Sequence, residues 1–206
     1  MIVTENMTQK DIINQSLERS MSYDLYVELV SELTENNSTT GPDKSEAMAN
    51  YTMLNHRRIK RWNKTVKVSD EAKSVVEGFN KDQTWLVLTE SWCGDAAHIM
   101  PVINKVAELN DNIDYRVVLR DENEALMNEF LTNGGKAIPK LIMIDNQTRE
   151  VAGSFGPRPS VAAQLVNTYK AEHGKLTPEF KEDLQRWYNK DKGQTTISDL
   201  VNLLSD

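Results

Sequence analysis

The single cysteine of the chain, Cys93, stands where an apolar run gives way to an amphipathic one. The run at residues 85–88 is typical of a buried strand, and Trp92-Cys93-Gly94 follows it closely. Beyond this turn, apolar residues return at the spacing of one helix face, at Ile99, Val102, Ile103 and Val106. Unpaired backbone N–H groups and the positive end of a helix dipole favour a thiolate. We therefore expect a reactive thiol near a helix N-terminus, with a semi-buried, unreactive cysteine as the alternative.

The other side chains that could take part in acid–base or metal chemistry are scattered. The three histidines, His56, His98 and His173, show no metal-ligand spacing with one another or with Cys93, so no metal site is expected. His98 lies five residues after Cys93, which places it off the cysteine's own face of the predicted helix. We interpret it as a surface or supporting histidine in preference to a base for the thiol. No cofactor is expected.

Positive charge gathers at residues 56–64, near the end of a predicted helix. Solvated cations that complement the helix dipole are the simpler interpretation, and contact with an anion or a thiol cofactor is the alternative. Arg120 and Arg158 each follow a predicted strand. Both could offer positive charge to a thiolate or an acidic ligand, and surface ion pairs are equally consistent with their positions.

The elements that would hold Cys93 alternate between strands and helices. Periodicity and turn residues predict strands that begin at Thr84 and that cover 113–119, 140–144 and 151–155. Helices are predicted after Ser69 or Asp70, after Cys93, over 122–131 and after Gly156. This order is an α/β fold with a mixed sheet.

Helical segments flank this central region on both sides. Residues 1–20 are predicted to be a frayed helix or a disordered lead. Ser22 can cap a helix, and residues 45–62 form another, with one face made of Met48, Tyr51, Leu54 and Ile59. The tail carries a helix that begins at Thr177 and a last one over 197–204. We expect these flanks to pack on the sheet or on each other, with a homodimer surface as the alternative.

The stretch around Cys93 resembles the active site of the thioredoxin superfamily, whose usual motif is Trp-Cys-Gly-Pro-Cys. Three further features match: Pro101 inside the following helix, Ile138-Pro139 at the position of the cis-proline loop, and Gly156 before the last helix of the domain. The resemblance covers about residues 66–172. It implies a thioredoxin-like domain there, with an N-terminal helical extension (1–65) and a C-terminal one (173–206). More narrowly, the chain resembles a bacterial group with Cys-Gly-Asp-Ala in the motif, for which no reaction is established.

Departures from the family pattern bear on the chemistry. A thioredoxin attacks a disulfide with its first cysteine and resolves the mixed disulfide with its second, and Ala96 holds that second position here. The buried aspartate and the nearby lysine of thioredoxins correspond to Val87 and Val117. Because a buried carboxylate would cost stability without a resolving thiol to serve, the losses are mutually consistent. Dithiol reductase activity is not expected.

The resemblance leaves three functions open. In the first, Cys93 forms a mixed disulfide with a protein or a low-molecular-weight thiol, which an external thiol resolves. The cleft that would hold the ligand is then lined by Trp92, Gly94, Asp95, Ala96, Ile138 and Pro139. In the second, the fold is a non-catalytic binding module and Cys93 is incidental. The third and weakest is an iron–sulfur scaffold like that of monothiol glutaredoxins. Asp95 suits a helix start, but its charge would oppose a thiolate on Cys93.

Composition narrows the setting. A length of 206 residues fits one domain with additions, and a net charge of −7 argues against nucleic acid as a partner. No apolar run approaches the roughly 18 residues of a membrane span, and the first ten residues do not resemble a signal peptide. A single cysteine forbids an intramolecular disulfide, which fits a reducing compartment. We therefore expect a cytoplasmic protein.

Overall fold

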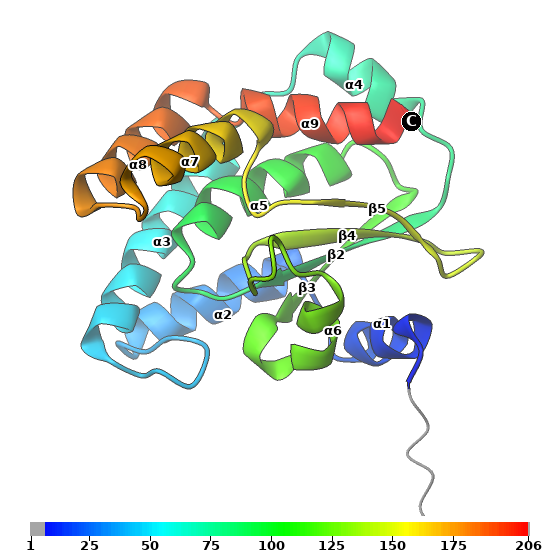
Figure 1. Ribbon diagram of the computed structural model, residues 1–206. Helices are drawn as coiled ribbons and strands as arrows, with labels where there is room; N and C mark the ends of the chain where they lie inside the picture. The colour runs from blue at the N-terminus through cyan, green and yellow to red at the C-terminus, as the bar shows by residue number, and fades with distance from the viewer. Residues whose placement is uncertain (1–6, 206) are drawn as a thin grey trace, which may run out of the picture.

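The computed structural model describes residues 7–205, and a five-stranded mixed sheet lies at their centre (Figure 1). The strands are β1 (Met21–Ser22), β2 (Gln83–Thr89), β3 (Ile113–Leu119), β4 (Lys140–Asp145) and β5 (Val151–Phe155). They lie side by side in the order β1-β3-β2-β4-β5. Only the β2–β3 pair is parallel among these neighbours, since the others are antiparallel. The predicted α/β fold with a mixed sheet is confirmed.

Helices cover both faces of the sheet. They are α1 (Gln9–Glu18), α2 (Tyr23–Glu35), α3 (Glu46–Thr65), α4 (Asp70–Glu77), α5 (Gly94–Ala107), α6 (Glu124–Glu129), α7 (Ser160–His173), α8 (Pro178–Asp191) and α9 (Gln194–Ser205), with the 3-10 turn η1 (Arg120–Glu122) before α6. Helices α5 and α9 lie above the sheet in the view of Figure 1, and α1 and α6 lie below it. Helix α3 packs on α5, and α2 packs on α3.

The hydrophobic core follows from the two-sided cover of the sheet. Every residue of β2 is buried, as are the first five residues of β4, because helices lie over both faces of these central strands. Val87 on β2 and Val117 on β3 are paired in register and fully buried. The positions of the thioredoxin aspartate and lysine are thus neighbouring and apolar here.

The beginning of the chain is more ordered than the sequence suggested. Of the two expectations, a frayed helix or a disordered lead, disorder is wrong for residues 9–18, which form the capped helix α1; residues 1–6 lie outside the described part. Thr8 and Asp11 make a capping box at its start, and Ile13 is buried. The short strand β1 then pairs with β3, so this extension also adds an edge to the sheet.

The buried face of α3 also differs from the predicted one. Tyr51 and Leu54 are exposed, at 52% and 41%, so the face drawn through the apolar residues was wrong. The inward face holds Thr52, Asn55, Ile59 and Trp62. Two of these are polar, and both hydrogen-bond the segment that precedes Cys93: Asn55 donates to the carbonyl oxygen of Ser91, and the Thr52 and Ser91 hydroxyls are hydrogen-bonded to each other. An interpretation that counts apolar residues alone assigns the wrong buried face to such a helix.

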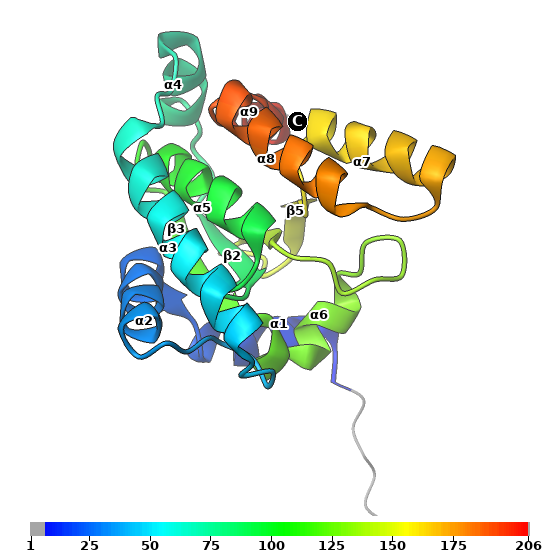
Figure 2. The ribbon, with the colours of Figure 1, turned by 90° about the vertical axis from the view of Figure 1, so that its left-hand side faces the viewer.

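The C-terminal helices pack on the body of the protein. Helix α9 contacts α4, α5 and α7, and Figure 2 shows α8 alongside α7. Between α8 and α9, Gly193 has φ +80°, and a Cβ at this position would lie 2.7 Å from Cγ2 of Val102 on α5. The turn is therefore pressed against α5. Among the helices of residues 7–205, none is both long and apolar enough to span a membrane.

Candidate functional site

Cys93 is the N-cap residue of α5 and is only 8% exposed. Its thiol donates a hydrogen bond to the carbonyl oxygen of Ile138, at 3.3 Å. Burial, and then the charge of Asp95, raise the pKa of Cys93 to about 12, against the lowering effect of the backbone N–H groups of Ala96 and Asp95. The thiol form is therefore the resting form at neutral pH.

Asp95, in the first turn of α5, is held by two groups from later in the chain. Nη2 of Arg158 lies 2.6 Å from its Oδ2, and the hydroxyl of Tyr188 on α8 donates to its Oδ1 at 2.9 Å. Burial raises the pKa of the Asp95 carboxyl, and Arg158 and Tyr188 oppose that shift. The ion pair keeps a negative charge beside the cysteine, where it disfavours a thiolate.

The Ile138–Pro139 loop, which faces Cys93, packs closely against Gly156. The Ile138–Pro139 peptide bond is cis, and Ile138 and Pro139 are both buried. Gly156, at the end of β5, has φ +106°, and a Cβ there would lie 2.3 Å from the carbonyl oxygen of Pro139. Glycine is required for this contact, which sets the loop at its distance from the thiol.

The segment before Cys93 is fixed by hydroxyl groups from the N-terminal extension. Oγ of Ser91 lies 2.8 Å from Oγ1 of Thr52 on α3 and 3.1 Å from that of Thr39. Thr40 completes the cluster, since its backbone N–H donates to Ser91 Oγ and its hydroxyl accepts from the backbone N–H of Ser91. The loop before α3 is therefore part of the support for the cysteine turn.

Trp92 and Gly94 border the cysteine on its two sides. The guanidinium carbon of Arg120 lies 5.0 Å from the Trp92 ring centroid, and Nε of Arg120 donates to Asp121 at 2.8 Å. Arg120 is thus engaged with its neighbours and not with Cys93. On the other side, a Cβ added to Gly94 would lie 3.4 Å from Nη1 of Arg58.

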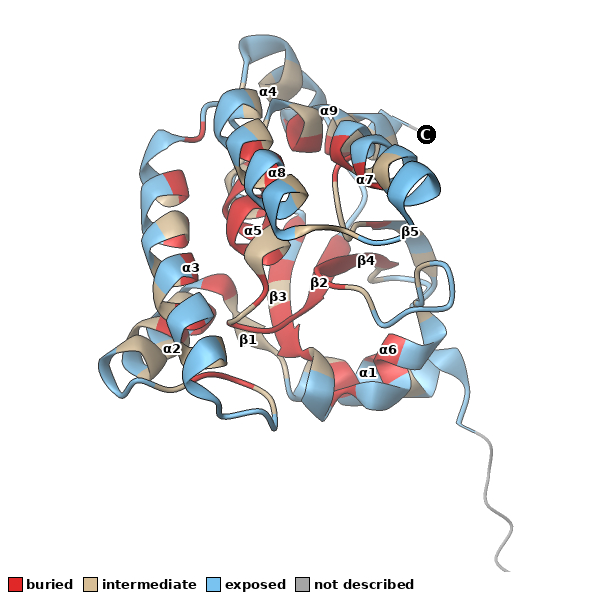
Figure 3. Cartoon of the chain, turned by 60° about the vertical axis from the view of Figure 1, so that its left-hand side comes forward, coloured by how far each residue is buried: buried red, intermediate tan, exposed pale blue. Residues whose placement is uncertain are grey.

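His98 is buried beneath α8, so it is the supporting histidine of the interpretation above and not the surface one. It is 3% exposed and its ring is stacked on Tyr188, with centroids 4.5 Å apart. Nε1 of Trp62 donates to Nδ1 of His98 at 2.8 Å, so the hydrogen resides on Nε2, which donates to Gln185 at 2.8 Å. Burial lowers the pKa of His98 to about 3. The neutral His98 on α5 is therefore hydrogen-bonded to both α3 and α8. Figure 3 shows these three helices beside one another.

The structure brings the seven residues expected at the site together in one region. Cys93, Gly94, Asp95 and Ala96 belong to the start of α5, and the Ile138–Pro139 loop faces them. Reasoning from the sequence missed Tyr188, Gln185 and the Thr39–Thr40 loop. An acidic residue at a helix start signals that a cation or hydroxyl could pair with it, but no pattern in the sequence identifies a partner 93 residues away.

The residues of the site do not assemble a metal centre. Within residues 7–205, no group of three or more histidine, cysteine, aspartate or glutamate side chains is placed to hold a metal ion. The arrangement is instead a buried thiol bonded to Ile138, an Asp95–Arg158 ion pair that also receives the Tyr188 hydroxyl, and a neutral histidine bonded to Trp62 and Gln185; Nε of Arg158 is buried without a hydrogen-bond partner among the described residues.

Comparisons with known proteins agree on the fold. A family model described as Thioredoxin matches residues 41–171. A crystal structure of a protein of unknown function from Pseudomonas aeruginosa is similar over 90% of this chain and 98% of its own, with 15% identity and a TM-score of 0.57. An HIV epitope scaffold gives the same coverages, with 16% identity and a TM-score of 0.56. No curated protein matches significantly. The two structures show the fold alone.

Proposed function

Because the chain belongs to the thioredoxin family, we propose that it is a thioredoxin-fold binding module in which Cys93 is a structural thiol and not a redox nucleophile. One observation carries the proposal: the buried thiol donates its hydrogen to Ile138 while a paired carboxylate, Asp95, lies beside it. Both features favour the protonated form of the cysteine.

The chemistry of thiol–disulfide exchange supports this reading. Exchange begins with attack by a thiolate. Because burial raises the pKa of Cys93 to about 12, the thiolate is a minor form at pH 7.5. Ala96 then offers no second thiol to release a trapped partner. Val87 and Val117 supply no ionisable group beneath the site.

The proposal is tested by challenging the full chain with oxidised glutathione and weighing the products by mass spectrometry. In a productive reaction, the Cys93 thiolate would bond to one glutathione sulfur and release the other as a thiolate. We expect the native protein to keep its mass over a period in which urea-unfolded protein is fully converted. Rapid, Cys93-dependent conversion of the native chain would overturn the proposal, and Cys93→Ser supplies the negative control.

A monothiol redox protein is the second candidate, and a specific feature favours it. Cys93 is the N-cap of a 14-residue helix, and the N–H groups of Asp95 and Ala96 favour its thiolate. A partner that displaced the Cys93–Ile138 hydrogen bond and moved Asp95 away from the thiol would lower the pKa of Cys93 and so favour its thiolate. The client would then be a protein or low-molecular-weight molecule that bears a thiol or disulfide, and the glutathione experiment gives the opposite result.

A further inference from the structure

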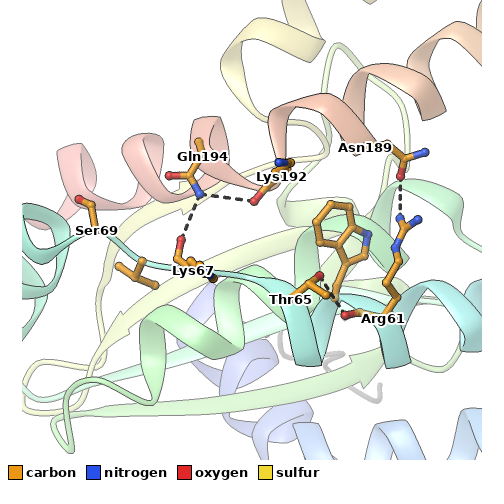
Figure 4. Close-up of a pocket in the computed structure, with 9 residues that line it drawn as sticks. Arg61, Thr65, Lys67, Ser69, Asn189, Lys192 and Gln194 are labelled. Carbon is orange, nitrogen blue, oxygen red and sulfur yellow. Dashed lines mark hydrogen bonds between the residues drawn. The ribbon is translucent and has the colours of Figure 1, made fainter.

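Away from Cys93, the helical flanks enclose a pocket whose charge is opposite to that of the whole chain. A cavity of about 590 Å³ lies between the end of α3, the α3–α4 connection and the α8–α9 turn. Arg61, Lys67 and Lys192 line it, as Figure 4 shows, and no acidic residue is among its lining residues. The chain as a whole has a net charge of −7, so this concentration of positive charge is local.

The guanidinium group of Arg61 is held in place by neutral partners. Its central carbon lies 4.7 Å from the ring centroid of Trp62, and its Nη2 donates to Oδ1 of Asn189 at 2.6 Å. Trp62 is in turn anchored by its hydrogen bond to His98. Arg61 is therefore ordered without being neutralised, and its remaining N–H groups are available to a ligand.

The backbone of both lysines is fixed by one side chain. Nε2 of Gln194 donates to the carbonyl oxygen of Lys67 at 3.1 Å and to that of Lys192 at 3.4 Å. Figure 4 shows Gln194 between the two segments. In the described part of the chain, no carboxylate oxygen lies within 4 Å of the charged nitrogens of Arg61, Lys67 or Lys192. The pocket thus holds three cations on fixed backbones without a counter-ion.

A second cavity continues the first along the α3–α8 boundary. It measures about 290 Å³, shares Arg61 and Asn189 with the first, and adds Arg57 and Arg58. Nη1 of Arg58 donates to the amide oxygen of Asn55, again a neutral partner. Together the two cavities form a basic groove, defined by these three arginines with Lys67 and Lys192.

We infer that the basic groove binds a small molecule that carries phosphate groups. Arginine guanidinium and lysine ammonium groups are the side-chain groups that commonly bind phosphate. Because the groove holds several of them, it favours an anion with more than one negative charge. The combined space falls in the range of small-molecule sites. The inference names a ligand class for the binding module and rests on that proposal only for the biological role, because the groove does not include Cys93.

Calorimetric titration of the full chain with inorganic pyrophosphate, at 150 mM salt and pH 7.5, tests the inference. We expect saturable binding of one pyrophosphate per chain, weakened at least tenfold in the double variant Lys67→Gln/Lys192→Gln. The matched control is Lys73→Gln/Lys105→Gln, which removes the same charge from α4 and α5 and should leave the affinity within about twofold of wild type. Urea unfolding of both variants verifies that they remain folded.

Three results would overturn the inference. They are an absence of binding by the wild-type chain, equal weakening in both double variants, and tighter binding of citrate than of pyrophosphate at the same ionic strength. The first would show that the groove does not bind pyrophosphate. The second would show that binding depends only on overall charge, and the third that the groove prefers carboxylates. None depends on whether Cys93 reacts with glutathione, so the two proposals fail separately.

Discussion

At the scale of single residues, the site is governed by how burial and charge act on three ionisable groups. Burial is the main cause that raises the pKa of Cys93 and of Asp95, and it also lowers the pKa of His98. Each shift favours the neutral form of the group. Arg158 opposes the effect of burial most strongly at Asp95, since its guanidinium pairs with that carboxylate, and it opposes the shift of Cys93 more weakly. The neighbouring negative charge then adds to the protonation of Cys93.

The variant Asp95→Asn tests the influence of this charge on the thiol. Removing the carboxylate takes away a negative charge and leaves Arg158 unpaired, and both changes lower the pKa of Cys93. We expect the pH midpoint of its alkylation to fall relative to wild type, and the free energy of unfolding to fall by about 1–3 kcal/mol because Arg158 loses its partner. Asp111→Asn, a remote and exposed change of the same charge, should alter neither. An unchanged midpoint in Asp95→Asn would contradict the electrostatic argument.

The lowered pKa of the buried His98 predicts that the protein loses stability in acid. The pKa of His98 is about 3 when folded and near 6.5 when unfolded, so the unfolded chain binds one more proton between these values. The stability that depends on neutral His98 is present above pH 6.5 and is lost as the pH falls toward 3, by up to about 1.4 kcal/mol per pH unit. Urea unfolding from pH 7 to pH 4 should show a shallower decline for His98→Gln. Parallel curves for the two proteins would refute the burial of a neutral histidine.

At the scale of elements, the loop that faces Cys93 depends on the end of β5. We expect Gly156→Ala to lower the free energy of unfolding by about 3 kcal/mol or more, because its Cβ would meet the Pro139 carbonyl and its φ is +106°. The comparison is Gly134→Ala, where φ is +76° but no atom lies within 4 Å of the new Cβ. That variant should lose only about 1 kcal/mol. Equal losses in urea unfolding would show that contact with the loop is unimportant.

The elements that the sequence predicted best are those whose cause is local. Strands over 113–119 and 151–155 have the predicted bounds, because β-forming runs end at turn residues there. The start of α5 at Cys93 was likewise predicted from a strand followed by helical periodicity. Helix α1 was predicted only as a frayed or disordered lead, because its stability comes from a capping box and from the burial of Ile13 against distant elements. Propensity alone does not register such tertiary support.

For the candidate site, the sequence supplied the turn and the facing loop but not the contacts that set the chemistry. Asp95 was recognised as a charge that would oppose a thiolate, whereas its partners Arg158 and Tyr188 come from segments that only folding brings near. His98 was placed correctly on the helix, yet its burial depends on α8 packing over it. The depth of a residue beneath distant helices sets its pKa, and periodicity carries no measure of that depth.

At the scale of the whole molecule, the two helical flanks complete the thioredoxin-family body. The N-terminal flank adds β1 to the sheet and supports Ser91 through the Thr39–Thr40 loop. The C-terminal flank covers the start of α5 through Tyr188 and Gln185. Between the flanks lies the basic groove. The molecule therefore covers the position of the family's thiol chemistry and presents a basic groove beside it, since Arg58, His98 and Gln185 line the second cavity of that groove.

The most direct test of this account is the pH dependence of Cys93 alkylation by iodoacetamide in the native full-length protein, followed by mass spectrometry. Reaction of the unfolded chain in urea gives the reference, with a pKa near 8.5 for an unperturbed cysteine. We predict that the native thiol stays essentially unlabelled at pH 8.5 and that its reaction midpoint lies well above that value. A midpoint below 8.5 in the folded chain would contradict the account and would establish Cys93 as an activated nucleophile.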